Sequence, residues 1–238
     1  TNLVDIKNKK VLEIGPGSGN LTKNILQKRP KKIFLVEKDK RLCEILNSKL
    51  SSYPNYTLFN DDILKFNIDK NLSIDLIFGN LPYNISTQIL IKFLKLNPWS
   101  TKLRKIIFMF QREVGEKIIA KFGNKNYSRL SIITRSRLKV EDYFYVSKNS
   151  FYPKPKIDSI VISFAPIFKK DLNLKSLDSL EYITRVIFSN KRKMINKTIK
   201  KILNDQDIKS INGLKLNSRP SEIKPETYYR ITELFEKK

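Results

Sequence analysis

Residues 79–86, GNLPYNIS, place an amide side chain, a backbone carbonyl, a proline and an aromatic ring next to one another. The Asn80 side-chain oxygen and the Leu81 carbonyl could each accept one hydrogen of an exocyclic amine, such as N6 of adenine. Two such acceptors would localise the nitrogen lone pair, which is otherwise delocalised into the ring, and direct it toward a methyl donor. Pro82 restricts Leu81 to extended conformations and so helps to orient that carbonyl.

Two neighbouring residues complete this hypothesis. The Tyr83 ring offers a face on which a base can stack, which is worth about 1–3 kcal/mol, and Gly79 would leave room for the base to enter. The chemistry requires no titrating base, and the chain contains no His. The alternative is an ordinary Asn/Pro turn, so the elements around the motif must decide between the two interpretations.

A glycine-rich segment, EIGPGSG at residues 13–19, lies between a predicted strand and a predicted helix. Glycines there allow a ligand to approach the backbone closely, and the first turn of the helix offers free N–H groups. The spacing differs from the G-x-G-x-x-G of dinucleotide sites, which must hold a pyrophosphate. S-adenosylmethionine has no phosphate and fits this loop. We assign the loop to the cofactor through Glu13, Gly15, Gly17 and Gly19.

Two acids follow the next two predicted strands. Glu37 ends a strand over residues 32–37, where a carboxylate can accept both ribose hydroxyls. Asp62 follows a strand over residues 56–59, where it could accept a hydrogen bond from the adenine amino group. Each feature has a structural alternative, a tight turn or a solvated acid. Together, in this order at successive strand ends, they favour an adenosyl ligand.

The elements that position these residues alternate between short apolar runs and helical patterns. Strands are predicted over residues 11–14, 32–37, 56–59, 74–78 and 105–110, with 140–146 and 159–164 closing the sheet. Helices are predicted over residues 20–27, 40–50 and 87–96, and from about residue 112. This alternation predicts an α/β fold, with a parallel sheet covered by helices on both faces. Ligands of such sheets bind at the carboxyl ends of the strands.

Beyond Pro166 the strand signals stop. Residues 180–203 have one long helical pattern, and residues 217–236 contain a final helix. We therefore predict a methyltransferase domain over residues 1–166 and a small all-helical, RNA-binding domain over residues 167–238.

The charge balance points to a polyanionic partner. Lys and Arg number 47 against 23 Asp and Glu, a net charge of +24, which favours RNA or DNA, although AT-biased coding would also enrich Lys. A target base inside a duplex would have to be flipped out to reach a site at a sheet edge. The candidate phosphate contacts are Arg112, Arg129, Lys191, Arg192, Lys193 and Lys197. The alternative for the run near residue 192 is a solvated helix face.

Other classes are excluded by composition. With no His and a single cysteine, Cys43, there is no basis for His catalysis, an internal disulfide or a multi-Cys zinc site, and we expect no metal. No run approaches the roughly 20 apolar residues that span a bilayer, so no membrane partner is expected. One cysteine suits a reducing compartment. We expect a cytoplasmic location, or an organellar one in a eukaryote.

Seven segments carry a family resemblance. In chain order they are VLEIGPGSGNLT, VEKDKRL, NDDILKF, IFGNLPYNIS, FQREVGEKI, NYSRLSII and FYPKPKIDSIV. Over residues 10–238 the chain resembles the rRNA adenine N6-dimethyltransferases, and specifically their small-subunit branch, bacterial in type with organellar relatives.

The resemblance implies a Rossmann-like class I methyltransferase sheet of seven strands with a small helical C-terminal domain. It also implies transfer of methyl groups from S-adenosylmethionine, leaving S-adenosylhomocysteine. The acceptors would be the N6 atoms of two adjacent adenosines near the 3′ end of small-subunit rRNA, each dimethylated, in an assembling ribosomal subunit. We expect the enzyme to act as a monomer.

The same resemblance implies roles for individual residues. The implied cofactor contacts are Gly15, Glu37, Asp62 and Asn80. The implied target-base site consists of Asn80, Leu81, Pro82 and Tyr83. Phe151, which opens FYPKPKIDS, resembles a second aromatic residue that packs on the flipped base, whereas the sequence alone would suggest a core aromatic. Nine residues precede Lys10 here, and the resemblance leads us to expect an earlier segment with a Gly-Gln-Asn-Phe-Leu-like motif that helps to enclose the cofactor.

Three alternatives stay open. The large-subunit rRNA adenine N6-methyltransferases of the macrolide-resistance type share the cofactor loop and a similar base motif, but FQREVGEKI and NYSRLSII favour the small-subunit branch. A non-catalytic RNA-binding assembly factor on the same fold would be signalled by a degenerate motif at residues 80–83 or by loss of Glu37, and both are intact. An NAD-linked Rossmann enzyme explains neither that motif nor the charge.

Overall fold

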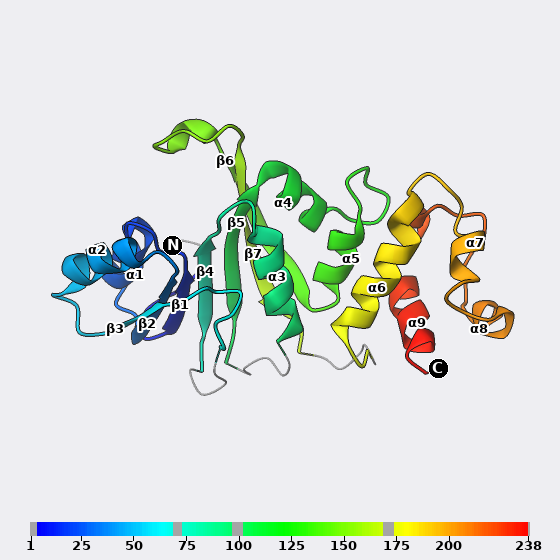
Figure 1. Cartoon of the computed structure of the whole chain (residues 1–238), viewed down its shortest axis with the longest axis horizontal. Coiled ribbons are helices and arrows are strands. Elements are labelled where there is room, and N and C mark those ends of the chain that lie inside the picture. Colours follow the sequence, from blue (N-terminus) through cyan, green and yellow to red (C-terminus); the bar gives the residue numbers. More distant parts are fainter. Residues whose placement is uncertain (1–3, 69–72, 97–101, 169–173, 238) are drawn as a thin grey trace. The chain divides into compact units, whose positions relative to one another are not determined.

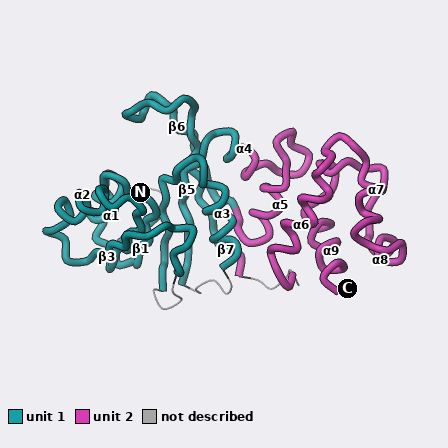
Figure 2. The backbone as a smooth tube through the Cα atoms, viewed as in Figure 1, with its two compact units in different colours: residues 1–115, 140–166 teal, residues 116–139, 167–238 magenta. Residues whose placement is uncertain are grey.

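The computed structural model describes residues 4–68, 73–96, 102–168 and 174–237 (Figure 1). Its elements divide into two compact units, residues 1–115 with 140–166 and residues 116–139 with 167–238 (Figure 2). In these described ranges, no helix has both the length and the apolar character that crossing a membrane requires.

The first unit is built on one seven-stranded sheet with the order β3-β2-β1-β4-β5-β7-β6. Its strands are β1 (Lys10–Ile14), β2 (Lys32–Glu37), β3 (Tyr56–Asn60), β4 (Leu76–Asn80), β5 (Lys105–Gln111), β6 (Leu138–Val146) and β7 (Ser159–Pro166). The strands β1 to β5 pair in parallel, and β7 is antiparallel to β5. The predicted Rossmann-like, mostly parallel sheet is confirmed.

Four helices follow strands of this sheet. They are α1 (Asn20–Gln27), α2 (Lys40–Leu50), α3 (Ser86–Lys95) and α4 (Arg112–Ile119). Each has the predicted periodicity of apolar residues, so one face of the helix is buried. In α1 and α2 that face includes Ile25 and Leu46, which pack with Val11 and Leu35 of the sheet into one core cluster.

The strand register brings the ends of the parallel strands to a common edge. Ile14, the last residue of β1, pairs with Val36 of β2 and with Gly79 of β4. Glu37, the last residue of β2, pairs with Asn60 of β3. The loops that leave β1, β2, β3 and β4 therefore begin side by side, as the sequence analysis required.

The antiparallel strand β7 begins at this same edge. Gln111, the last residue of β5, pairs with Ser159, the first residue of β7. The connection from β6 to β7 contains the short 3₁₀ helix η2 (Lys148–Ser150) and the segment FYPKPKIDS. That segment thus enters the sheet next to the loops that follow the parallel strands.

The second unit is helical, as predicted for the C-terminal part. Its helices are α5 (Arg129–Arg135), α6 (Leu177–Ile187), η3 (Phe188–Asn190), α7 (Asn196–Ile199), α8 (Asp205–Lys209), η4 (Pro220–Glu222) and α9 (Pro225–Phe235). Buried tyrosines tie these helices together through backbone carbonyls: the Tyr229 hydroxyl donates to Ile132 of α5 and the Tyr228 hydroxyl to Pro220.

The unit boundaries differ from the expected division in one segment. The expected break between residues 166 and 167 coincides with a junction of the two units, but residues 116–139, which we placed in the first domain, belong to the second unit. The reason is tertiary: α5 packs against α6 and α9, and the Tyr127 hydroxyl donates to the Ile223 carbonyl.

The continuous helix predicted over residues 180–203 is wrong in its second half. The helix α6 ends at Ile187, and residues 191–195 form a turn and bends before α7. The N–H groups of Ile195 and Asn196 donate to the carbonyls of Ser218 and Leu216, so tertiary hydrogen bonds replace a continuous helical ladder. The basic cluster at residues 191–193 consequently lies in an exposed turn.

A glycine sets the close packing of α4 on β7. A Cβ added to Gly115 would overlap Ile160 Cγ2, and Ile160 is fully buried. We expect Gly115→Ala to lower the free energy of unfolding by about 1–3 kcal/mol, because the core must shift to admit the methyl group. Urea unfolding followed by circular dichroism measures this. Lys121→Ala, at an exposed position after α4, should be neutral, and equal stability of the two variants would contradict the packing argument.

Candidate active site

The loop after β1 is held by the carboxylate that ends β2. Glu37 is 7% exposed, and it accepts the Gly17 N–H at Oε2 (3.1 Å) and the Asp39 N–H at Oε1 (2.9 Å). Gly15, Gly17 and Gly19 have φ angles of 61°, 58° and 85°, a region that glycine adopts without strain. Each Glu37 oxygen retains a lone pair for a further donor, such as a ribose hydroxyl.

The second acid of this loop, Glu13, is a core residue. It is 1% exposed. Its Oε2 atom and the hydroxyl of Thr22 are both buried. Burial raises the pKa of the Glu13 carboxyl to about 7; the Thr22 hydroxyl opposes this effect, and the charge of Glu37 adds to it. The predicted cofactor residue therefore lies within the protein at the start of the loop.

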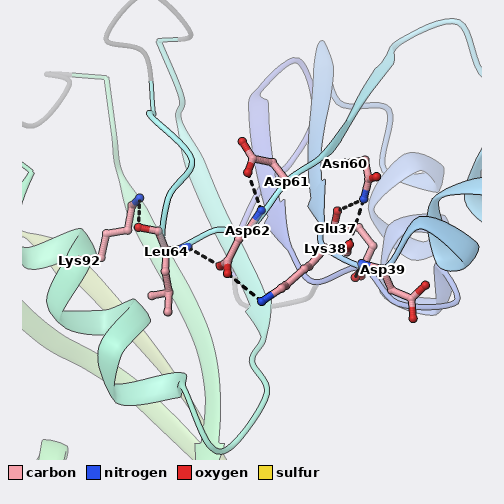
Figure 3. A network of polar contacts seen from close by, with 8 residues as sticks. All are labelled: Glu37, Lys38, Asp39, Asn60, Asp61, Asp62, Leu64 and Lys92. Atoms are coloured by element: carbon pink, nitrogen blue, oxygen red, sulfur yellow. Dashed lines mark hydrogen bonds and ion pairs between the residues drawn. The ribbon is translucent and has the colours of Figure 1, made fainter.

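The loops after β2 and β3 are joined by polar contacts (Figure 3). Asp62 is half-buried; its Oδ2 accepts from Lys38 Nζ (2.9 Å) and its Oδ1 from the Leu64 N–H (2.9 Å). These bonds, that of Lys38 first, lower the pKa of Asp62. The Asn60 amide donates to the Glu37 carbonyl (3.1 Å). The Asp62 carboxylate is thus ionised and oriented, with lone pairs left for one more donor.

A lysine of α3 completes this network. Lys92 Nζ donates to the carbonyls of Leu64 (3.0 Å) and Phe66 (2.6 Å), as Figure 3 shows for the first of these. Burial lowers the pKa of Lys92, while the nearby charge of Asp61 opposes the shift. Sequence analysis missed Lys92 because nothing near it in the chain signals a contact with a loop almost thirty residues earlier.

The motif at residues 80–83 begins at the end of β4. Asn80 is exposed, whereas the Leu81 side chain is 2% exposed and anchors the chain in the core. A Cβ added to Gly15 would lie 3.9 Å from the Asn80 carbonyl oxygen, so the glycine loop and this motif are neighbours.

The space expected above Gly79 is not open: a Cβ there would lie 2.5 Å from Leu81 Cδ2 and 3.1 Å from Phe108 Cδ1. Position 79 needs a glycine because the Leu81 and Phe108 side chains leave no space for a Cβ atom.

The Tyr83 ring is held at its hydroxyl by a residue of β7, two strands along the sheet from β4. Its hydroxyl lies 2.7 Å from the Ser159 hydroxyl of β7, and Ser159 is fully buried. The backbone turn is fixed as well, since the Tyr83 carbonyl accepts from Ser86 Oγ (3.1 Å) and the Pro82 carbonyl accepts from the Ile85 N–H (3.2 Å). Sequence analysis did not identify Ser159, which lies at the end of the quoted FYPKPKIDS segment.

Phe151 lies in the connection that precedes Ser159 and is half-buried. Its N–H group donates to the Lys148 carbonyl (3.4 Å), which ends η2. Among the described residues no ring contact joins Phe151 to Tyr83. Its role on a bound base stays a prediction.

The six candidate phosphate contacts fall into three groups. Arg112, in the first unit, has a side chain that is 55% exposed and lies 3.9 Å from Asp158. In the second unit Arg129 is half-buried and donates to the Glu181 carbonyl (3.3 Å), and burial lowers the pKa of its guanidinium. This geometry favours a packing role for Arg129. The exposed members of the second unit are Lys191, Arg192, Lys193 and Lys197.

Comparison with known proteins points in one direction. A family model described as "Ribosomal RNA adenine dimethylase" matches residues 1–237. The ribosomal RNA small subunit methyltransferase A of Pelagibacter ubique is 42% identical, over 99% of this chain and 89% of its own length. The protein of the same name from Borreliella burgdorferi (strain ZS7) is 35% identical, over 96% of this chain and 80% of its own.

Solved structures agree on the fold. A dimethyladenosine transferase from Plasmodium falciparum superposes with a TM-score of 0.81 at 26% identity, covering 98% of this chain and 92% of that one. The 23S rRNA methyltransferase ErmE has a TM-score of 0.72 at 23% identity, covering 99% and 94%. The second likeness concerns the fold alone.

The buried carboxyl of Glu13 predicts a pH dependence of stability. Its pKa is about 7 in the folded protein against an ordinary value of 4.5, so between these values the folded chain holds a proton that the unfolded chain has lost. The contribution of the protonated Glu13 carboxyl to the free energy of unfolding is complete below pH 4.5 and is lost as the pH rises through 7. Relative to Glu13→Gln, the free energy of unfolding should fall by up to about 3 kcal/mol over this window. Urea midpoints across pH measure it, and parallel curves for the two proteins would contradict the assignment.

Proposed function

The chain belongs to the ribosomal RNA adenine dimethylase family, and from this premise we propose that it dimethylates N6 of two adjacent adenosines near the 3′ end of small-subunit rRNA. The relatives at 35–42% identity bear the small-subunit name, which favours this substrate over the large-subunit alternative. The observation that carries the proposal is the position of Asn80–Tyr83, beside the glycine loop and fixed through Ser159. The assembling subunit as substrate, the monomeric state and the cytoplasmic location stay predictions.

The cofactor side of the site suits S-adenosylmethionine, which supplies an electrophilic methyl group when bound. The backbone of the Gly15–Gly19 loop would approach the ligand closely, since its glycines leave no side chain in the way. Glu37 would accept the ribose hydroxyls with an already oriented carboxylate. Asp62 would accept a hydrogen bond from the adenine amino group, with the hydrogen bond from Lys38 keeping it ionised.

The acceptor side would hold the target base. The Asn80 side-chain oxygen and the Leu81 carbonyl would accept the two N6 hydrogens and localise the nitrogen lone pair. The buried Leu81 side chain keeps that carbonyl in place. Tyr83, held by Ser159, would present its ring to the base, with Phe151 as the second aromatic. Rate acceleration would come from positioning and from preorganised dipoles.

The RNA backbone would be held mainly by exposed cations. The turn at residues 191–193 and Lys197 lie on the surface of the second unit. Phosphate contacts of this kind provide affinity and little sequence information. Choice of the target would then depend on the fold of the rRNA.

The first test removes the side-chain acceptor. We expect Asn80→Ala to lower methyl transfer at least about 100-fold, the scale seen when one preorganised polar group is lost from a transition-state site, while RNA binding stays nearly intact. Incorporation of labelled methyl groups into unmethylated small subunits measures transfer, and filter binding measures RNA affinity. Asn84→Ala, in the turn that follows β4 and also exposed, should retain activity. Full activity of Asn80→Ala would refute the base-site assignment.

The second test concerns the Asp62 loop. Lys92→Met removes both hydrogen bonds to the loop carbonyls, and each such charged bond contributes about 1.5–3 kcal/mol. We expect the Kd for S-adenosylmethionine to rise about tenfold or more, with kcat at saturating cofactor little changed. Isothermal titration calorimetry measures the Kd. Gln88→Met, exposed on the same helix, is the control, and an unaltered Kd in Lys92→Met would show that the loop is positioned without Lys92.

A further inference from the structure

The end of β6 and the connection that follows it, residues 143–157, carry four aromatic rings besides Phe151 that the proposed site does not use. We call residues 143–157 the aromatic arm. Tyr143, Phe144 and Tyr145 are 45%, 45% and 49% exposed, and Tyr152 is fully exposed. Figure 1 shows β6 and the connection that follows it projecting beyond the other strands. Contiguous exposed rings of this kind mark an interaction surface.

The rings of the arm have a defined arrangement. Tyr143 and Tyr145 lie two residues apart and therefore on the same face of β6; their ring centroids are 6.1 Å apart at 87°. The guanidinium carbon of Arg112 lies 5.1 Å from the Tyr145 centroid. Phe144 lies on the opposite face of the strand. One face of the arm thus combines two phenol rings with a cation.

The charge of the arm suits phosphate. Residues 143–157 contain three lysines and no acid. The lysines are Lys148, Lys154 and Lys156.

The flanking acids are already engaged by the protein: Glu141 lies 3.3 Å from Lys105 Nζ, and Asp158 accepts the Lys148 N–H (3.0 Å) and faces Arg112. Asp142 accepts the N–H of Tyr143 (2.8 Å). Rings interleaved with lysines bind unpaired nucleic acid by stacking and backbone attraction.

The arm also lies at the edge of the sheet where the target base would bind. Arg112 is the first residue after β5, and its N–H donates to the Asp158 carbonyl (3.0 Å). Ser159, which follows Asp158 in the chain, contacts the Tyr83 hydroxyl through its own hydroxyl group. A strand of RNA that leaves the base site on this side would run along the arm.

We propose that the aromatic arm binds the unpaired RNA nucleotides that flank the target adenosine. Bases stack on Tyr143 and Tyr145, while Arg112 and the arm lysines attract the phosphates. This inference rests on the proposed function, because it takes the nearby site to hold an adenosine of RNA.

The test compares two probes by fluorescence anisotropy at low salt, a labelled single-stranded RNA oligonucleotide and the same backbone with abasic sites. The double variant Tyr143→Ala/Tyr145→Ala should weaken binding of the RNA at least about tenfold and leave binding of the abasic backbone unchanged. Phe144→Ala, matched in exposure but on the other face, should bind both probes like the wild type. Lys154→Ala/Lys156→Ala should weaken both probes equally and reduce the dependence of affinity on salt. Unchanged circular dichroism and melting temperature establish that the variants are folded.

Several results would overturn the proposal. One is unaltered RNA binding by the double tyrosine variant, and another is an equal loss on both probes. Weaker binding to small ribosomal subunits with normal binding to the oligonucleotide would instead assign the arm to a ribosomal protein. A methyl-transfer assay of the wild type distinguishes the two hypotheses. If the wild type transfers methyl groups but the tyrosine variant binds RNA normally, only the proposal for the arm is refuted. If the tyrosine variant loses stacking but the wild type transfers no methyl group, the proposed function is refuted and the arm still binds RNA.

Discussion

The site depends on the parallel order of β1 to β5, because parallel strands bring all their carboxyl ends to one edge of the sheet. The hydrogen bond between Tyr83 and Ser159, at 2.7 Å, adds the antiparallel strand β7 to that edge. It links the loop after β4 to a strand on the far side of β5. A ring that must present one face to a base is thereby held at its hydroxyl end.

The loops at this edge are connected to one another by polar contacts of the protein itself. Glu37 accepts the Gly17 N–H of the β1 loop, Lys38 pairs with Asp62 of the β3 loop, and Lys92 of α3 donates to the same loop. A chain of contacts therefore runs from the glycine loop to the helix that follows the base motif. Groups fixed in this way lose little freedom when substrate binds, which is the condition for catalysis by preorganised dipoles.

The parts of the site that sequence could predict are those with local signals. The glycine loop, Glu37, Asp62 and the motif from Asn80 all stand at strand ends, and the alternation of apolar runs located those ends within one or two residues. Ser159 and Lys92 could not be assigned in the same way, because their roles depend on partners 76 and 28 residues away.

The mistaken helix and the one segment in which the expected domains differ from the compact units have the same origin. The apolar period continues through Ile195 and Ile199, and a helix was expected there, but the N–H group of Ile195 bonds to the carbonyl of Ser218. Residues 116–139 follow a strand of the sheet and were placed with it, although α5 contacts α6 and α9. In both cases long-range packing overrides a correct local pattern.

We propose that this chain dimethylates adenosine in small-subunit rRNA. Nucleoside mass spectrometry tests it most directly, on unmethylated small ribosomal subunits incubated with the protein and labelled S-adenosylmethionine. We expect label in N6,N6-dimethyladenosine, at two adjacent positions near the 3′ end of the rRNA. Tight binding to the subunit without any labelled adenosine would contradict it, and would favour a non-catalytic assembly factor on the same fold.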